Sequence, residues 1–245
     1  MRQGVIAAIM IWTLTGAAGP VQGVATGKDL TQVFDIYLGG LWIAEMTIDA
    51  NIGEDGYRAA AALQTKGIIG AIYKASFEAE AEGLVRGGGL ATGTFRANSR
   101  DVRKSQFVEM RYQGGRPAVL RAEPAFKPKP WEIEPTEQVG TADPLSAAIG
   151  ALNLAPGAPL CDRTVEIFDG RKRYAIEMGV PEENAGLIRC PALYQRVGGF
   201  KPKKMEQPDY PFEFWFEPLE DGGHRILRAM GSTPFGTAVI RQREG

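Results

Sequence analysis

The chain contains two cysteines, Cys161 and Cys190, which enclose a segment rich in the side chains of active sites: Asp, Glu, Arg, Lys and Tyr. Zinc takes about four ligands, and the single histidine, His224, cannot complete a Cys/His set. A redox pair usually has the spacing Cys-x-x-Cys, whereas these two cysteines are 29 positions apart. We therefore predict no metal, no cofactor and no redox centre.

Asp143 and Ser146 come closest to a catalytic arrangement. A nucleophilic serine needs a histidine base, so Ser146 would have to recruit His224. No Gly-x-Ser-x-Gly elbow surrounds Ser146, and His224 lies in Asp-Gly-Gly-His-Arg, a turn signal between two strands. A helix N-cap and its first turn have the same spacing as Asp143 and Ser146. We interpret Asp143 as a cap and His224 as a solvated loop residue, and predict no catalytic residue.

Three glutamates, Glu78, Glu80 and Glu82, form the most acidic cluster. They alternate with Ala79 and Ala81, so in a strand they project from the same face about 7 Å apart. This pattern favours the solvated face of a half-buried strand. A cation or substrate site is the alternative.

The charge balance excludes a basic nucleic-acid footprint. The chain has 28 basic and 29 acidic residues, and its net charge is −1. Lys201, Lys203 and Lys204, together with Lys127 and Lys129, are interpreted as loop residues. A lipid-headgroup site is the alternative for these lysines, although surface attraction usually needs clusters of at least about four adjacent bases.

The first residues have the layout of a secretory signal peptide. Arg2 precedes an uncharged apolar run, Val5 to Leu14, and small residues follow, with cleavage expected between Ala18 and Ala25. The run is about half the roughly 20 residues that a membrane-spanning helix needs. We predict a signal peptide over residues 1–25, a periplasmic location, and a mature chain that does not span the membrane.

Export places the two cysteines in an oxidising environment. A lone pair there is most simply a structural disulfide between Cys161 and Cys190, with two free buried thiols as the alternative.

Alternating patterns predict a mainly β protein. The chain has 31 glycines and 16 prolines, which punctuate many short segments. In residues 41–49, Trp42, Ala44, Met46 and Ile48 share one face of the expected strand. The segments 75–83, 212–217 and 235–241 alternate in the same way.

A few segments depart from this pattern. Asp143, with Pro144 at the first helical position, predicts a helix over residues 143–153, and residues 65–73 hold a short helical turn. Residues 123–140 are too rich in proline for a central strand and are expected to connect two β-rich halves of a single domain, residues 26–245. Asp169-Gly170 predicts a two-residue turn in a β-hairpin, whose charged residues would lie on the solvent side.

Several ordered motifs resemble a family of bacterial envelope proteins, domain of unknown function 3108, over residues 33–241. The motifs are FDIYLGGLWIAEM from Phe34, FEAEAEG from Phe77, TADPLSA from Thr141, FDGRKRY from Phe168 and CPALYQRVGGF from Cys190. The resemblance implies an exported β-rich protein of Gram-negative bacteria and supplies no catalytic residues. A related type of periplasmic protein forms a strongly curved antiparallel sheet, a spiral or open barrel with a disulfide. We expect this architecture here, with the helix at 143–153 packed against the sheet.

These observations predict a non-enzymatic periplasmic protein that supports the cell envelope by binding a protein partner or an apolar or lipid ligand. A curved sheet has a concave face that can hold such a ligand. Trp42, Phe77, Phe212, Phe214 and Phe216 are candidates for that face, with ordinary core packing as the alternative. The rival prediction is an enzyme acting on cell-wall or glycan substrates through Asp or Glu carboxylates.

Overall fold

The computed structural model describes residues 21–22, 24–152, 154–155, 157–220 and 222–243. Within these residues one antiparallel sheet of fifteen strands follows the order β8-β7-β6-β5-β4-β3-β2-β15-β14-β13-β12-β10-β9, with β1 paired to β6 and β11 paired to β12. No ladder joins the two ends of this order, β8 and β9, in the described part of the chain. The mainly β, open architecture predicted from the sequence is confirmed.

The strands are β1 (Val21–Gln22), β2 (Lys28–Leu38), β3 (Leu41–Ile52), β4 (Gly56–Thr65), β5 (Ser76–Arg86), β6 (Gly89–Arg100), β7 (Ser105–Gln113), β8 (Arg116–Glu123), β9 (Arg163–Phe168), β10 (Arg173–Met178), β11 (Glu182–Asn184), β12 (Leu187–Gly198), β13 (Tyr210–Pro218), β14 (His224–Thr233) and β15 (Gly236–Gln242). The helices are α1 (Gly67–Ile72), the 3-10 helix η1 (Pro135–Glu137), α2 (Pro144–Leu152) and α3 (Pro202–Met205).

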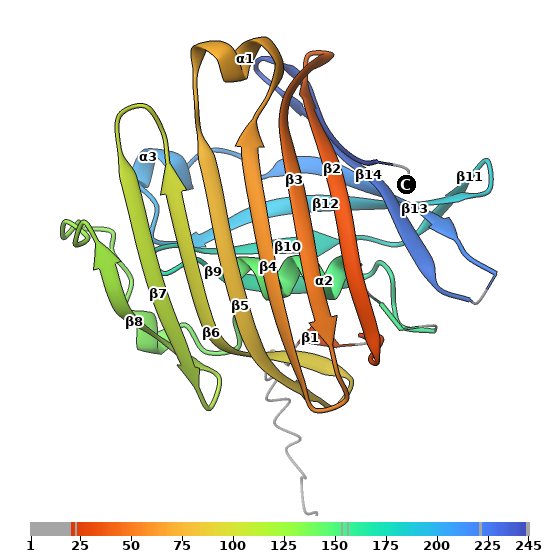
Figure 1. The fold of residues 1–245 in the computed structure, drawn as a ribbon, viewed down its shortest axis with the longest axis horizontal. Helices are drawn as coiled ribbons and strands as arrows, with labels where there is room; N and C mark the ends of the chain where they lie inside the picture. The colour runs from red at the N-terminus through yellow and green to blue at the C-terminus, as the bar shows by residue number, and fades with distance from the viewer. Residues whose placement is uncertain (1–20, 23, 153, 156, 221, 244–245) are drawn as a thin grey trace, which may run out of the picture.

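The sheet curls around helix α2. In Figure 1 strands β2 to β8 form an upright front layer, β9, β10 and β12 cross behind it, and α2 lies between them. The helix contacts β1, β4, β5, β6 and β9. The core is shared by both layers and the helix, and its most buried side chains include Ile48, Phe95, Ile149, Phe168 and Phe216.

Small side chains make room for this helix. The inward faces of β3, β4 and β5 carry alanines, and Ala50, Ala59 and Ala81 lie side by side in register. On the opposite face of β5, Glu78, Glu80 and Glu82 are exposed, so the predicted alternation of this strand is confirmed. Larger inward residues would fill the space that α2 occupies.

The predicted face of Trp42 is wrong, because a β-bulge interrupts β3. Ala44 pairs with Ile36, whereas Trp42 pairs with Tyr37, and the register shifts between them. Paired residues share a face of the sheet, so Trp42 lies on the face opposite to Ala44. Its side chain is 39% exposed.

The proline-rich connection predicted at residues 123–140 spans the open side of the sheet. On one side, Arg116 of β8 donates a hydrogen bond from Nη1 to the Thr136 carbonyl oxygen at 3.3 Å. On the other side, Arg171 lies in the loop between β9 and β10. Its guanidinium carbon is 4.7 Å from the centroid of the Phe126 ring, over which it stacks. Beyond it, Ala142 forms an isolated parallel bridge with Ile167 of β9.

Strands β9 and β10 form the predicted hairpin, but its loop has four residues, 169–172, and not two. Asp169 Oδ1 accepts hydrogen bonds from the amides of Arg171, at 2.9 Å, and Lys172, at 2.8 Å. This side-chain turn holds a longer loop than the Asp-Gly pair alone indicates. The predicted loop lysines Lys203 and Lys204 lie in the short exposed helix α3.

The N-terminal end of the described chain belongs to the β domain. Val21 pairs with Leu90 and Val24 is buried in the core, so the domain includes residues upstream of the predicted boundary at residue 26. Residues 1–20, which carry most of the predicted signal peptide, lie outside the described residues. None of the helices in the described ranges is long and apolar enough to cross a bilayer.

A disulfide joins Cys161, which precedes β9, to Cys190 of β12, with the two Cα atoms 5.5 Å apart. Both cysteines are buried. The bridge encloses the whole β9–β10 hairpin, as the sequence predicts, and ties the last strand of the sheet order to the core.

Replacing both cysteines by alanine should lower the free energy of unfolding by about 3–4 kcal/mol, because the bridge restricts a loop of this length in the unfolded chain. Urea unfolding of the wild type under oxidising and reducing conditions measures the effect, and the double variant should be insensitive to reductant. Equal stability of the oxidised wild type and the variant would contradict a structural role for the bridge.

Candidate functional site

A buried polar network fixes the N-terminus of α2. Asp143 Oδ1 accepts hydrogen bonds from the amides of Leu145, at 2.9 Å, and Ser146, at 3.0 Å. Asp143 Oδ2 accepts from the hydroxyls of Thr92, at 2.9 Å, and Ser146. The Ser146 and Tyr57 hydroxyls share a further hydrogen bond of 2.5 Å. The predicted N-cap at Asp143 is confirmed.

This network is buried inside the domain. Asp143 and Ser146 have no exposed surface, so no substrate contacts them in this conformation. Ser146 bonds to Asp143 and Tyr57, whereas His224 lies opposite Pro218 at the start of β14. His224 is half-buried in a strand, and its predicted loop position is wrong. The turn ends before it, within 219–223.

The electrostatics of the network are dominated by burial. Burial raises the pKa of the Asp143 carboxyl, while its hydrogen bonds from Ser146, Thr92 and Leu145 act in the opposite direction. Burial also raises the pKa of the Tyr57 hydroxyl, and the nearby Asp143 carboxylate adds to the shift. The phenol therefore stays protonated and available for its hydrogen bond with Ser146.

A second β-bulge turns Thr92 toward the network. Glu82 pairs with Thr94 but Gly83 pairs with Thr92, so Gly93 is the extra residue. The shift places Thr92 beside Gly83 and Tyr57 on the inner face of the sheet. A Cβ atom on Gly83 would lie 2.8 Å from the Tyr57 ring and would also collide with the Ala91 carbonyl oxygen. Sequence reasoning missed Thr92, and the glycines at 83 and 93 were the available signal.

The open side of the sheet holds a cleft of about 700 Å³, here called the seam cleft. It lies between β6 and the end of β7 on one side and β9 with residues 139–142 on the other. Its lining residues are Arg86, Leu90, Ala91, Thr92, Tyr112, Gly114, Gly115, Val139, Gly140, Thr141, Ala142, Pro159, Arg163, Thr164, Val165 and Glu166.

Two polar groups of the seam cleft are buried without a well-formed hydrogen bond. Arg163 Nε and Nη2 make no hydrogen bond to any described residue, and the Tyr112 hydroxyl lies near the Thr141 side chain without a hydrogen bond of good geometry. Burial lowers the pKa of Arg163 and raises that of Tyr112, yet an arginine at this position remains charged. The prediction that the charged residues of the β9–β10 hairpin lie on the solvent side is wrong for Arg163.

The other charges of the seam cleft do not neutralise Arg163. Glu166 lines the cleft but accepts a hydrogen bond from Nε of Arg173, a residue outside the lining, at 3.0 Å, and the two form an ion pair. Arg86 is exposed at the rim. The lining therefore carries an excess of positive charge next to apolar side chains such as Leu90 and Val165.

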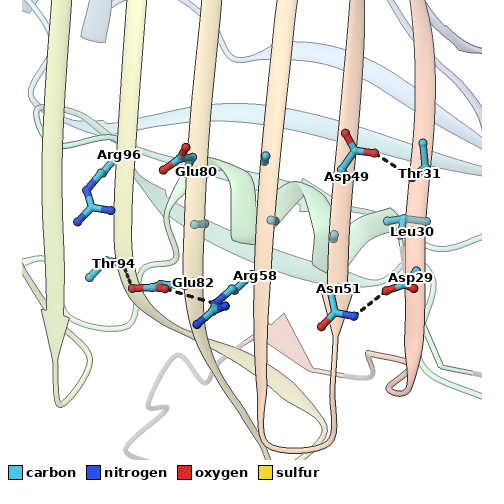
Figure 2. A pocket seen from close by; sticks show the side chains of 14 residues that line it. Asp29, Leu30, Thr31, Asp49, Asn51, Arg58, Glu80, Glu82, Thr94 and Arg96 are labelled. Carbon is cyan, nitrogen blue, oxygen red and sulfur yellow. Dashed lines mark hydrogen bonds and ion pairs between the residues drawn. The ribbon is translucent and has the colours of Figure 1, made fainter.

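The glutamate cluster belongs to a second, shallower hollow on the outer face of the sheet (Figure 2). Glu80 and Glu82 project there beside Arg58 and Arg96, and Arg58 Nε lies 3.8 Å from Glu82 Oε2. Thr94 also donates to Glu82, at 3.0 Å. Within the described residues, no three His, Cys, Asp or Glu side chains are placed to hold a metal ion.

Four of the aromatic candidates for the concave face serve packing, whereas Trp42 is exposed. Phe216 is in the core, and Phe77 and Phe214 are partly buried against it. Phe212 and Phe214 stack edge to face, with centroids 5.1 Å apart. Helix α2 fills the concave side of the sheet, so the space for a ligand lies at the seam.

The fold and its seam cleft define an open, beta-barrel-like protein built around a buried helix. Over 90% of this chain and 98% of the other, it is similar to the crystal structure of a beta-barrel-like protein of domain of unknown function DUF1849 from Brucella abortus, with a TM-score of 0.52 and 14% sequence identity. No curated protein sequence matches the chain. The model of the family "Protein of unknown function (DUF3108)" matches residues 33–242, and the chain belongs to this family.

Replacement of Asp143 tests the structural role of the buried network. Asp143→Ala should lower the free energy of unfolding by at least about 2 kcal/mol, because it removes the cap and leaves buried hydroxyl and amide donors unpaired. Asp143→Asn keeps an acceptor oxygen and should lower the free energy of unfolding by less than Asp143→Ala does. Urea unfolding of both variants measures the difference, and equal costs would contradict the network.

The pH dependence of the same variants has a defined sign. The raised pKa means that folded Asp143 keeps its proton at pH values where the unfolded carboxyl, with a pKa of about 3.9, has lost it. Protonation of Asp143 therefore contributes to the free energy of unfolding. This contribution is complete at pH values below the pKa of the unfolded carboxyl and is lost as the pH rises through the pKa of the folded carboxyl. The stability of the wild type relative to Asp143→Asn should therefore fall as the pH rises above about 4. A constant difference across this range would contradict the raised pKa.

Proposed function

We propose that this protein is a non-enzymatic, exported binding protein that holds an apolar or lipid ligand in the seam cleft and thereby supports the cell envelope. The observation that carries the proposal is the cleft itself, whose volume of about 700 Å³ lies in the range of small-molecule sites. Its walls combine apolar side chains with a few polar groups, which is the usual composition of such sites.

The position of the cleft supports ligand entry. It lies where β8 and β9 fail to pair, and residues 139–142 form part of its wall. Because this wall is a connection held to β9 by a single bridge, a small displacement would widen the cleft without breaking a ladder of the sheet. The concave side offers no comparable space, since α2 occupies it.

An exported location is the natural context for this proposal. The N-terminal sequence has the features of a signal peptide, and the disulfide between Cys161 and Cys190 is compatible with an oxidising compartment. An envelope lipid or a protein-bound acyl chain is then the expected source of the ligand.

Native mass spectrometry of protein purified gently from the envelope of the producing cells tests the proposal. The wild type should carry a bound lipid-sized adduct that is lost on denaturation. A Val165→Trp variant, which fills the cleft from β9, should lose the adduct, whereas Val180→Trp, at a site 67% exposed and outside the lining, should retain it.

Two results would count against the proposal. Absence of any adduct from the wild type, together with no binding of added lipids, would contradict a ligand-binding role. Hydrolysis of a cell-wall glycan that is lost in Glu80→Gln or Glu82→Gln would instead support the rival enzyme, with the outer hollow as its site.

A further inference from the structure

We infer that Arg163 makes the seam cleft selective for ligands with an anionic head, a carboxylate or a phosphate, attached to an apolar body. This inference rests on the proposed function and specifies the chemical class of the ligand. The guanidinium of Arg163 presents its donors in a planar fork that matches both anions.

The burial of two guanidinium nitrogens of Arg163 carries the argument, while the residue as a whole is half-buried. Its Nε and Nη2 atoms are buried and make no hydrogen bond or ion pair with any described residue. A buried charge without a partner is costly, and proteins normally pair such a group. Arg173, on the same hairpin, is paired with Glu166, and Arg228, whose Nε also lacks a hydrogen bond, lies over the Trp215 ring at 4.8 Å. An anion bound in the cleft supplies the missing partner.

The surroundings of Arg163 match an amphiphile and not a free inorganic anion. Leu90, Val139 and Val165 line the same cleft and offer apolar contact for a hydrocarbon segment. The Tyr112 hydroxyl, which lies near Thr141 without a hydrogen bond of good geometry, is a second donor in the lining, and its raised pKa keeps its proton in place. A cationic fork, a phenol donor and apolar walls together favour an anionic amphiphile.

Ligands that share one tail but differ in the head isolate the role of the charge. Laurate and dodecyl phosphate carry the two anions, and dodecanol is the neutral control. Displacement of a fluorescent fatty acid should show wild-type protein binding both anions at least about tenfold more tightly than dodecanol, which is the effect of one charge-assisted hydrogen bond. A preference for one anion over the other identifies the head, carboxylate or phosphate.

Arg163→Met should reduce this preference to less than about threefold, while dodecanol binding stays within about twofold of the wild type. Arg111→Met is the matched control, because Arg111 is exposed and lies outside the lining of the cleft, and it should retain the preference. Arg163→Lys should retain part of the preference, and Tyr112→Phe should reduce it by less than Arg163→Met.

The outcomes separate this inference from the proposed function. If neither anions nor dodecanol bind, the proposed function fails. If anions and dodecanol bind equally well to the wild type, or if Arg163→Met retains the preference, the selectivity of Arg163 is contradicted while the binding role stands. The melting temperature without ligand gives an independent check: Arg163→Met should match or exceed the wild type, whereas a purely structural arginine would lower it on removal.

A separate observation concerns the end of the sheet that carries α1. The turns between β2 and β3 and between β14 and β15 meet there beside the helix (Figure 1). The Gly39 amide donates to the Thr237 carbonyl oxygen at 2.9 Å, and the Lys66 amide donates to that of Ile43 at 2.9 Å. Six large apolar residues are exposed at this end and are here called the tip patch: Leu41, Trp42, Ile68, Ile72, Tyr73 and Phe235.

We further infer that the tip patch docks on an anionic lipid surface. Ile72 is 78% exposed and Phe235 is 80% exposed, which is unusual for side chains that gain free energy on burial. The neighbouring turn between β6 and β7 adds Arg100, Arg103 and Lys104, with Lys74 directly after α1, against one acid, Asp101. Protruding apolar side chains beside bases are the composition of membrane-surface sites.

The fold creates this arrangement from residues that are dispersed in the sequence. Arg100, Arg103 and Lys104 follow Lys74 by about 30 positions, but Asp101 interacts electrostatically with Tyr73, which places the two turns together. No ion pair involves these four bases within the described residues. Lys104 interacts electrostatically with Asp101, and the excess of bases over this one acid leaves a positive charge that can attract anionic lipid headgroups.

Sedimentation with vesicles tests the lipid-docking inference. The wild type should bind phosphatidylglycerol-containing vesicles, bind pure phosphatidylcholine vesicles at least about threefold more weakly, and lose the difference at high salt. The double variant Ile68→Ser/Ile72→Ser should bind less than one third as much. Leu120→Ser/Val180→Ser, which alters two exposed apolar residues elsewhere, should bind like the wild type.

Three results would overturn the docking inference: no vesicle binding by the folded wild type, equal binding by both double variants, or equal binding to both lipids. Size-exclusion chromatography without vesicles covers a further possibility. Self-association that is lost only in Ile68→Ser/Ile72→Ser would assign the tip patch to a contact between copies of the chain and contradict docking on lipid.

Discussion

The buried carboxylate of Asp143 is the interaction on which the rest of the structure depends. It caps α2 by accepting from two amides and joins the helix to β6 through Thr92, while Ser146 extends the network to Tyr57 of β4. A buried carboxylate is tolerated only when donors surround it. The helix therefore has one favourable position inside the sheet, and the curvature of β3 to β6 must accommodate that position.

This requirement explains the composition of the inner face. Alanines on β3, β4 and β5 leave space below the helix, and Gly83 leaves space for the Tyr57 ring. With α2 packed against the concave side, a hollow of about 700 Å³ is found at the seam.

Local patterns predict the elements well but do not predict which faces meet. The alternation around Glu78 to Glu82, the capped helix at 143–153 and the β9–β10 hairpin follow from the neighbouring residues and are observed. Trp42 and Thr92 were assigned to the wrong face or overlooked, because a single-residue bulge exchanges the faces of a strand. Arg163 was expected on a solvated face, since its burial depends on β6 and β7, which are distant in the sequence.

An open sheet has two unpaired edges, and such edges favour association with other strands. This protein covers both edges with the proline-rich connection and the residues that follow it: η1 contacts β8, and Ala142 bridges to β9. These contacts are isolated and do not form a ladder, so the edge strands β8 and β9 are not paired with each other. A full ladder between β8 and β9 would pair the edges, but it would also close the space beside Arg163. The incomplete closure of the sheet and the unpaired nitrogens of Arg163 are therefore consequences of the same architecture, because the side on which β8 and β9 do not pair is also where Arg163 Nε and Nη2 lack a partner among the described residues.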